Sequence, residues 1–313
     1  MQIQYNNGMK RWIGFFLLFG FFFLLVGCQA SPTEPDATLP VVESELKETP
    51  TPFQPETPTP TLHPTITPPE TETPTVTPTA AGCQETQGMV VDREIQAKGF
   101  NAPLEFKLYL PPCYETDAPQ EGYPLLTLLH GQTFTPQQWI EIGLAAKMDE
   151  LINDGEIAPF VVVMPYESAA YVGGLQTAIL KDLIPHLQDQ FLVCRGQDCN
   201  AIGGISRGGG WALSAVFKNP DAFTSLGLHS VPTSPGHLEI VRYGAASASP
   251  ENLPRIWVDY GLSDYWYASE KDLIETFDST GVDYEFTLNE GGHDNVYWET
   301  HLIEYLRWYA AGW

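Results

Sequence analysis

Short apolar runs alternate with helical patterns over the last ~230 residues, a length typical of one large domain. This alternation restricts the fold more than any other feature of the sequence. Residues 125–129 and 160–164 are almost entirely apolar, which is typical of strands buried on both faces of a parallel sheet. The pattern predicts further strands at 104–110, 201–205, 225–228, 256–258 and 284–288, and helices at 140–152, 177–184, 210–218, 270–277 and 297–308. Such alternation predicts an α/β fold with a mostly parallel central sheet and helices on both faces.

The first 27 residues have the organisation of an export signal. Lys10 and Arg11 precede an apolar run that is short for a spanning helix of ~20 residues. The run ends in LVGC at 25–28, which resembles the bacterial lipobox, where cleavage leaves the cysteine as a lipidated N-terminus. We therefore expect a signal peptide at 1–27, lipidation of Cys28, and an extracytoplasmic protein held at the outer face of a bacterial cell membrane. A plain transmembrane anchor is the alternative.

Residues 28–84 are predicted to be a disordered tether. Proline and threonine dominate this stretch, as in TPTP at 57–60 and TPTVTP at 73–78. Proline removes amide donors and apolar residues are sparse, so no core can form there. The remaining residues, 85–313, are enough for one core of the size that α/β enzymes use.

The formal net charge is −24, and an acidic chain repels phosphate backbones, so we expect no nucleic-acid partner. The oligomeric state is left open. Of the five cysteines, Cys113, Cys194 and Cys199 lie in the predicted domain and Cys83 lies at its start. Cys194 and Cys199 flank a short polar loop, which favours a disulfide between them and pairs Cys83 with Cys113. Free buried thiols are the alternative. A C-x-x-C pattern is absent, so we expect neither a metal nor another cofactor.

Residues 204–208 (GISRG) match the G-x-S-x-G pattern between an apolar strand and a helix. This is the context of the nucleophile elbow of the α/β-hydrolase fold, where a sharp turn leaves the serine oxygen exposed above a helix N-terminus. The alternative is an ordinary glycine-rich turn. We expect Ser206 to be a nucleophile.

A nucleophilic serine needs a base, and in this fold the chain order is serine, acid, histidine. His293 directly follows the last predicted strand, where a loop can bring its imidazole to the serine. The acid should follow the preceding strand. Asp264 and Asp259 are both candidates, and Asp264 is preferred because it lies beyond Gly261 in the loop rather than within the strand.

The negatively charged tetrahedral intermediate of acyl transfer requires preorganised hydrogen-bond donors. One should be the amide of Arg207, and the second the amide of Gln132 or Gly131, in the loop that His130 shapes. Trp139, Tyr166 and Trp211 are candidates for an aromatic substrate-binding surface, although core packing is an equal alternative for each.

With these residues placed, the domain from 92 to 313 resembles the putative-esterase family of α/β-hydrolases, which includes esterase D, feruloyl esterases, enterochelin esterases and antigen 85 mycolyltransferases. The resemblance rests on HG at 130–131, GISRGG at 204–209, GLSD at 261–264, and GHD at 292–294 followed by Trp298. It implies the same oxyanion loop, nucleophile, acid and base. Many members have methionine where this chain has Arg207. The short segment between 217 and 255 predicts no large lid and an open site.

The leading functional hypothesis is a serine esterase that hydrolyses carboxylic esters, either acylated carbohydrate, including polysaccharide-linked esters, or other small esters. Acyl transfer with the same three residues, and a non-catalytic binding lipoprotein, are the alternatives. Neither the acyl group nor the alcohol can be read from the sequence.

Overall fold

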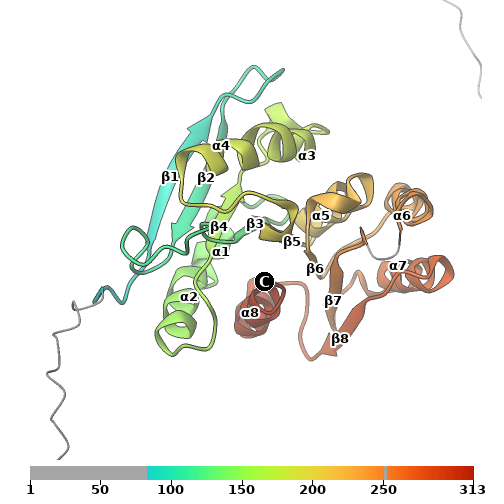
Figure 1. The fold of residues 1–313 in the computed structure, drawn as a ribbon. Coiled ribbons are helices and arrows are strands. Elements are labelled where there is room, and N and C mark those ends of the chain that lie inside the picture. Colours follow the sequence, from blue (N-terminus) through green and yellow to red (C-terminus); the bar gives the residue numbers. More distant parts are fainter. Residues whose placement is uncertain (1–82, 250–251) are drawn as a thin grey trace, which may run out of the picture. The chain divides into compact units, whose positions relative to one another are not determined.

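Eight strands form one sheet in the computed structural model, which describes residues 83–249 and 252–313. Their spatial order is β1-β2-β4-β3-β5-β6-β7-β8 (Figure 1). The strands are β1 (Met89–Ile95), β2 (Leu104–Leu110), β3 (Leu125–Leu129), β4 (Val161–Pro165), β5 (Asn200–Ile205), β6 (Ser225–His229), β7 (Arg255–Gly261) and β8 (Glu285–Asn289). β2 pairs antiparallel with β1 and β4, and all other neighbours are parallel, so the predicted mostly parallel sheet is confirmed.

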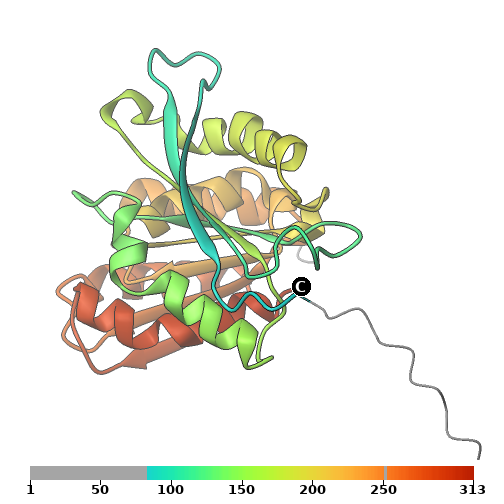
Figure 2. The ribbon, with the colours of Figure 1, turned by 90° about the vertical axis from the view of Figure 1, so that its left-hand side faces the viewer.

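Helices cover both faces of this sheet (Figures 1 and 2). One face packs against α1 (Gln137–Glu141), α2 (Leu144–Asn153) and α8 (Asn295–Ala310). The other face packs against α3 (Leu175–Ala178), α4 (Ile184–Gln190), α5 (Arg207–Lys218), α6 (Pro235–Ser247) and α7 (Tyr267–Thr280). A π-helical turn, Ile179–Leu183, joins α3 to α4. None of the helices in the described ranges has both the length and the apolar character needed to cross a membrane.

The four central strands β3, β4, β5 and β6 are buried along their whole length. Strands covered on both faces cannot alternate between apolar and polar side chains, which explains the nearly continuous apolar runs of β3 and β4. Their carboxyl ends lie at the same edge of the sheet, and ligand sites in such folds form just beyond that edge.

Several elements differ from the predicted pattern. The helix predicted at 140–152 is two helices, because Gly143 between α1 and α2 adopts φ 91°, which interrupts a helix. β1 was not predicted; it is an edge strand whose residues are exposed or half-buried, so it has no apolar run. α6 was not predicted either. Its start is capped by Ser234, whose hydroxyl accepts a hydrogen bond from the His237 amide.

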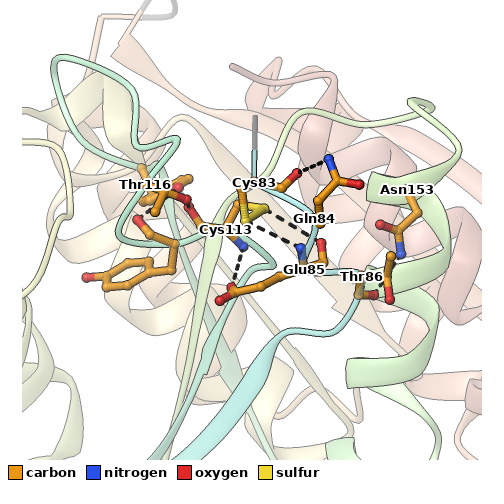
Figure 3. The surroundings of a disulfide bond; sticks show 9 residues. Cys83, Gln84, Glu85, Thr86, Cys113, Thr116 and Asn153 are labelled. Atoms are coloured by element: carbon orange, nitrogen blue, oxygen red, sulfur yellow. Dashed lines mark hydrogen bonds between the residues drawn. A yellow bond between two sulfur atoms is a disulfide. The ribbon is translucent and has the colours of Figure 1, made fainter. Parts of the chain in front are cut away.

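The described residues contain two disulfides, and both pairings agree with the prediction. Cys194 is bonded to Cys199, and Cys83 is bonded to Cys113. Figure 3 shows the second disulfide, where the Cys113 amide also donates to the Glu85 carboxylate at 3.1 Å. The disulfide therefore joins the first described residue to the segment that follows β2. The predicted signal peptide, the lipidation of Cys28 and the tether as far as residue 82 lie outside the described residues.

Candidate active site

The predicted nucleophile occupies a sharp turn between β5 and α5. Ser206 has φ 53° and ψ −123°, a conformation that non-glycine residues rarely adopt, and its amide donates to the His229 carbonyl at 2.8 Å. A Cβ at Gly204 would overlap the backbone of Gly208, and one at Gly208 would overlap the carbonyl of Leu129. The flanking glycines are therefore required by close backbone contacts.

The structure brings Ser206, His293 and Asp264 together although they are far apart in the sequence. His293 Nε2 lies 2.9 Å from Ser206 Oγ, and His293 Nδ1 lies 2.7 Å from Asp264 Oδ2. A carboxylate can only accept, so Nδ1 carries the proton and Nε2 accepts from the serine hydroxyl. Asp264 is 4% exposed, and its other oxygen accepts from the Trp266 amide at 2.8 Å. The imidazole is thus fixed in the orientation and tautomer that a general base needs.

The alternative acid, Asp259, is fully buried within β7 and turned to other partners. It accepts hydrogen bonds from His229 Nδ1 at 2.6 Å and from the hydroxyls of Tyr297 and Tyr305 at 2.8 Å each. Burial and the charge of Asp259 raise the pKa of both tyrosines, which keeps them as donors. This network joins β6 and β7 to Tyr297 and Tyr305 of α8, the helix that begins just after His293.

The two alternatives for the second oxyanion donor are distinguished by their existing hydrogen bonds. The Gly131 amide already donates to Gln138 Oε1 at 2.8 Å, so Gly131 was a wrong choice. Among the described residues, the backbone amides of Gln132 and Arg207 have no acceptor. These two amides remain as the candidate donors, from the loop after β3 and the start of α5.

The loop after β3 is held by the buried His130. Its Nε2 accepts from the Glu167 amide at 3.2 Å, so its Nδ1 carries the proton and donates to the Gly131 carbonyl at 2.9 Å. Burial lowers the pKa of His130, which agrees with a neutral ring. Gln138, which sequence reasoning missed, links the same loop to α8 through Asn295 Oδ1 at 3.0 Å.

A cavity of about 480 Å³ opens over the serine. Its aromatic lining comes from Phe134, Tyr265, Trp266 and Trp298, and its polar lining includes Gln132 and His293. Phe134, Tyr265 and Trp266 are 39%, 72% and 43% exposed, so the aromatic wall faces solvent. Apart from Trp298, these aromatic residues were missed; the aromatic pair directly after Asp264 was the available signal.

The three predicted substrate-binding aromatics do not line this cavity. Trp139 was wrong, because α1 places it in the core at 0% exposure. Trp211 is half-buried beneath the Arg207 guanidinium, which lies 4.6 Å above its ring. Tyr166 lines a separate hollow of about 710 Å³ beside β1 and β2.

Within the described ranges, the grouping of side chains that comes closest to a metal site is Cys83, Glu85 and Cys113. Its two sulfurs are joined in the disulfide of Figure 3, so no thiolate is offered.

The nucleophile elbow, the hydrogen-bonded serine and histidine, and the mostly parallel sheet define a serine hydrolase of the α/β-hydrolase fold. Residues 97–309 match the family described as "Putative esterase". The chain therefore belongs to this esterase family, in agreement with the resemblance noted from the motifs.

Known proteins agree with this assignment. The chain is 28% identical over 210 residues to an endo-1,4-beta-xylanase/feruloyl esterase of Xylanibacter ruminicola, an alignment covering 62% of this chain and 28% of the relative. A solved ferulic acid esterase has a TM-score of 0.64 at 23% identity, covering 72% of this chain and 99% of that one. The structure of a feruloyl esterase module from Clostridium thermocellum has a TM-score of 0.61 at 17% identity, covering 72% of this chain and 89% of that one. These two structures establish the fold, and the chain spans only about a quarter of the curated relative.

Proposed function

We propose that this chain hydrolyses carboxylic esters outside the cytoplasm through an acyl-enzyme on Ser206. The proposal is carried by the hydrogen-bond path from Ser206 Oγ through His293 to Asp264, at 2.9 and 2.7 Å. A serine hydroxyl is a weak nucleophile until an adjacent base takes its proton, and this path provides an oriented base.

In the first half of the reaction, Ser206 Oγ attacks the ester carbonyl carbon while its proton moves to His293 Nε2. The carbonyl π electrons move to oxygen, and the amides of Arg207 and Gln132 donate to the resulting oxyanion. Asp264 stabilises the imidazolium through Nδ1. Collapse of the intermediate breaks the bond to the alcohol oxygen, which leaves with the proton from Nε2.

In the second half, water enters in place of the alcohol. His293 takes a proton from the water as its oxygen attacks the acyl carbon. The second intermediate collapses by breaking the bond to Ser206 Oγ, which recovers the proton, and the carboxylic acid leaves. The base and the two donors therefore act twice in each turnover.

The aromatic wall of the cavity supports a substrate with an acyl group that can pack against Phe134, Tyr265 and Trp266. The Xylanibacter ruminicola relative is an endo-1,4-beta-xylanase/feruloyl esterase. We therefore take acylated carbohydrate as the preferred substrate, with other small esters as the alternative.

The predicted lipidation of Cys28 and the tether that follows it support a position at the outer face of the membrane. Cys28→Ser should leave the precursor uncleaved at residue 27 and abolish incorporation of labelled fatty acid. A Ser31→Ala variant is the control. Lipid labelling that persists in Cys28→Ser would contradict the anchor without affecting the esterase proposal.

The test of the esterase proposal is labelling with a fluorophosphonate, which reacts with activated serines. The folded protein should be labelled, and Ser206→Ala should not. Ser247→Ala, in α6, is the matched control and should label as the wild type does. Folded wild-type protein that resists labelling would overturn the proposal.

A substrate screen should then compare p-nitrophenyl esters of rising chain length with feruloyl and acetyl-sugar esters. Product analysis with and without an added alcohol acceptor separates hydrolysis from acyl transfer. Predominant transfer to the acceptor in water would replace the hydrolase with the transferase alternative.

A further inference from the structure

The loops that follow three neighbouring strands are tied to each other by side chains. β4, β3 and β5 are adjacent in the sheet, and the segments after them contain Glu167, His130 and Arg207, respectively. Arg207 Nη2 donates to Glu167 Oε2 at 2.6 Å, and the Glu167 amide donates to His130 Nε2 at 3.2 Å. Glu167 is therefore the centre of the tie, since its carboxylate holds one loop and its backbone holds the other.

The Arg207–Glu167 ion pair differs from an ordinary surface pair. The Glu167 side chain is only 5% exposed, against 38% for Arg207. Burial raises the pKa of Glu167, and the neighbouring guanidinium opposes that rise. The guanidinium also lies 4.6 Å above the Trp211 ring, so it is fixed on two sides. Paired charges with one partner buried are screened less by solvent than exposed pairs.

The two loops tied by Glu167 are those that carry the candidate oxyanion donors. Arg207 provides one amide itself, while its side chain does not line the cavity over Ser206. The other amide belongs to Gln132, one residue beyond Gly131, and both the amide and the carbonyl of Gly131 are held, by Gln138 and His130. The separation of the two amides therefore depends on how firmly the loops after β3 and β5 are held together.

We propose that Glu167 is a positioning residue, which acts through Arg207 and His130 to hold the two oxyanion donors at the spacing that the tetrahedral intermediate requires. The inference rests on the proposed esterase function and adds a residue that touches neither substrate nor nucleophile. Oxyanion contacts strengthen in the transition state rather than in the bound ester, so loosening the tie lowers kcat and leaves KM nearly unchanged.

The experiment compares Glu167→Gln, which keeps the shape but removes the charge, with Arg207→Met, which removes the guanidinium but keeps the backbone amide. Each should lower kcat on the best p-nitrophenyl ester on the order of tenfold, less than the loss of 10²–10³ from deleting a donor outright. KM should stay within about twofold. The kcat of the double variant should be no lower than that of the less active single variant, because both substitutions remove the same Arg207–Glu167 interaction.

A second readout separates donor spacing from general structural damage. An arylboronic acid forms a tetrahedral adduct with the serine and places an oxygen where the oxyanion forms. Its inhibition constant should rise by the same factor as kcat falls, while competitive inhibition by the product carboxylic acid stays unchanged. The matched control is Asp189→Asn, which breaks the exposed Arg195–Asp189 pair at 2.7 Å in the segment before β5 and should leave every constant unchanged.

Arg207→Lys keeps a cation within reach of Glu167, so its kcat should exceed that of Arg207→Met. This comparison tests the proposal even if Glu167→Gln fails to fold in a thermal melt. Unchanged kcat in Glu167→Gln, additive losses in the double variant, a KM effect alone, or no rescue by lysine would each overturn the inference. A wild-type protein that neither labels nor hydrolyses any ester would instead overturn the esterase proposal beneath it.

Discussion

Asp264 and Asp259 are five residues apart, yet their environments assign them different tasks. Asp264 contacts the imidazole that reaches the serine, whereas Asp259 is enclosed by His229 and two tyrosine hydroxyls. These three hydrogen bonds hold the Asp259 carboxylate in the core, while Asp264 is the partner of His293 Nδ1. Asp259 instead holds Tyr297 and Tyr305 of α8, the helix that begins just after His293.

Asp264→Asn should lower kcat by about 10³–10⁴-fold, because the asparagine amide can donate to His293 Nδ1 and favour the tautomer that carries its proton on Nε2. The folded state should be retained, since the substitution keeps the side-chain shape. Steady-state kinetics and a thermal melt measure both effects. Asp259→Asn is the companion variant, and it should mainly lower the melting temperature. A loss of kcat in Asp259→Asn, with kcat retained in Asp264→Asn, would identify Asp259 as the acid instead.

Glu270, in α7, is 1% exposed and neither of its carboxylate oxygens has a hydrogen-bond partner among the described residues. Burial, followed by the charges of Asp264 and Asp259, raises its pKa to about 8. The folded protein therefore keeps a proton at neutral pH that the unfolded chain, with a pKa near the ordinary value, releases. Glu270 consequently disfavours the folded state increasingly as the pH rises from its ordinary pKa to about 8.

Glu270→Gln should remove this dependence. Relative to the variant, the wild-type free energy of unfolding should fall by about 1.4 kcal/mol per pH unit between pH values near 4.5 and 8, then level off. Urea unfolding at several pH values measures the difference. Parallel curves for the two proteins over that range would show that Glu270 is ionised in the folded state.

Among the elements, the turn from β5 into α5 is constrained by close backbone contacts. Gly204→Ala should destabilise the fold by at least about 2 kcal/mol and slow fluorophosphonate labelling, because the added Cβ overlaps the Gly208 backbone. Gly236→Ala in α6 is the control, since its Cβ meets nothing closer than 3.7 Å. Urea unfolding and labelling rates check both variants. Equal stability of the two would mean that the elbow can relax around a side chain.

The elements that sequence reasoning predicted are those whose burial forces a repeating pattern. β3 and β4 are buried on both faces, so their apolar runs were unambiguous. The edge strand β1 has no such pattern, and the break at Gly143 depends on a backbone conformation that apolar spacing does not reveal.

The same reasoning explains the outcome at the site. Ser206, Asp264 and His293 could be chosen because the fold fixes their order and each follows a strand. The aromatic lining could not, because Phe134, Tyr265 and Trp266 are on loops without periodicity. Trp139 was misassigned because the distance from a motif in sequence does not tell which face of α1 is buried. The sequence also gives no sign that the Gly131 amide donates to Gln138 Oε1, because that contact forms only in the folded chain.

For the whole molecule, the two disulfides should contribute unequally to stability. Cys83–Cys113 spans 30 residues and Cys194–Cys199 spans 5. Loop-closure entropy predicts losses of about 4 and about 2 kcal/mol when each pair is replaced by serine. Chemical unfolding of the two double variants tests the order, and the fluorophosphonate labelling rate tests whether the site is intact. A larger loss from the short loop would mean that native-state contacts outweigh chain entropy.

The Cys83–Cys113 bond also determines how the domain bears mechanical load. A pull on any residue before Cys83 enters the domain at that sulfur and crosses directly to Cys113 (Figure 3). The strands β1 and β2 lie between the two cysteines in the chain, so they are bypassed by the force. An edge strand pulled from its end would lose its hydrogen bonds one at a time. Here β1 and β2 carry no tension, because the force passes from Cys113 into the segment that leads to the buried strand β3.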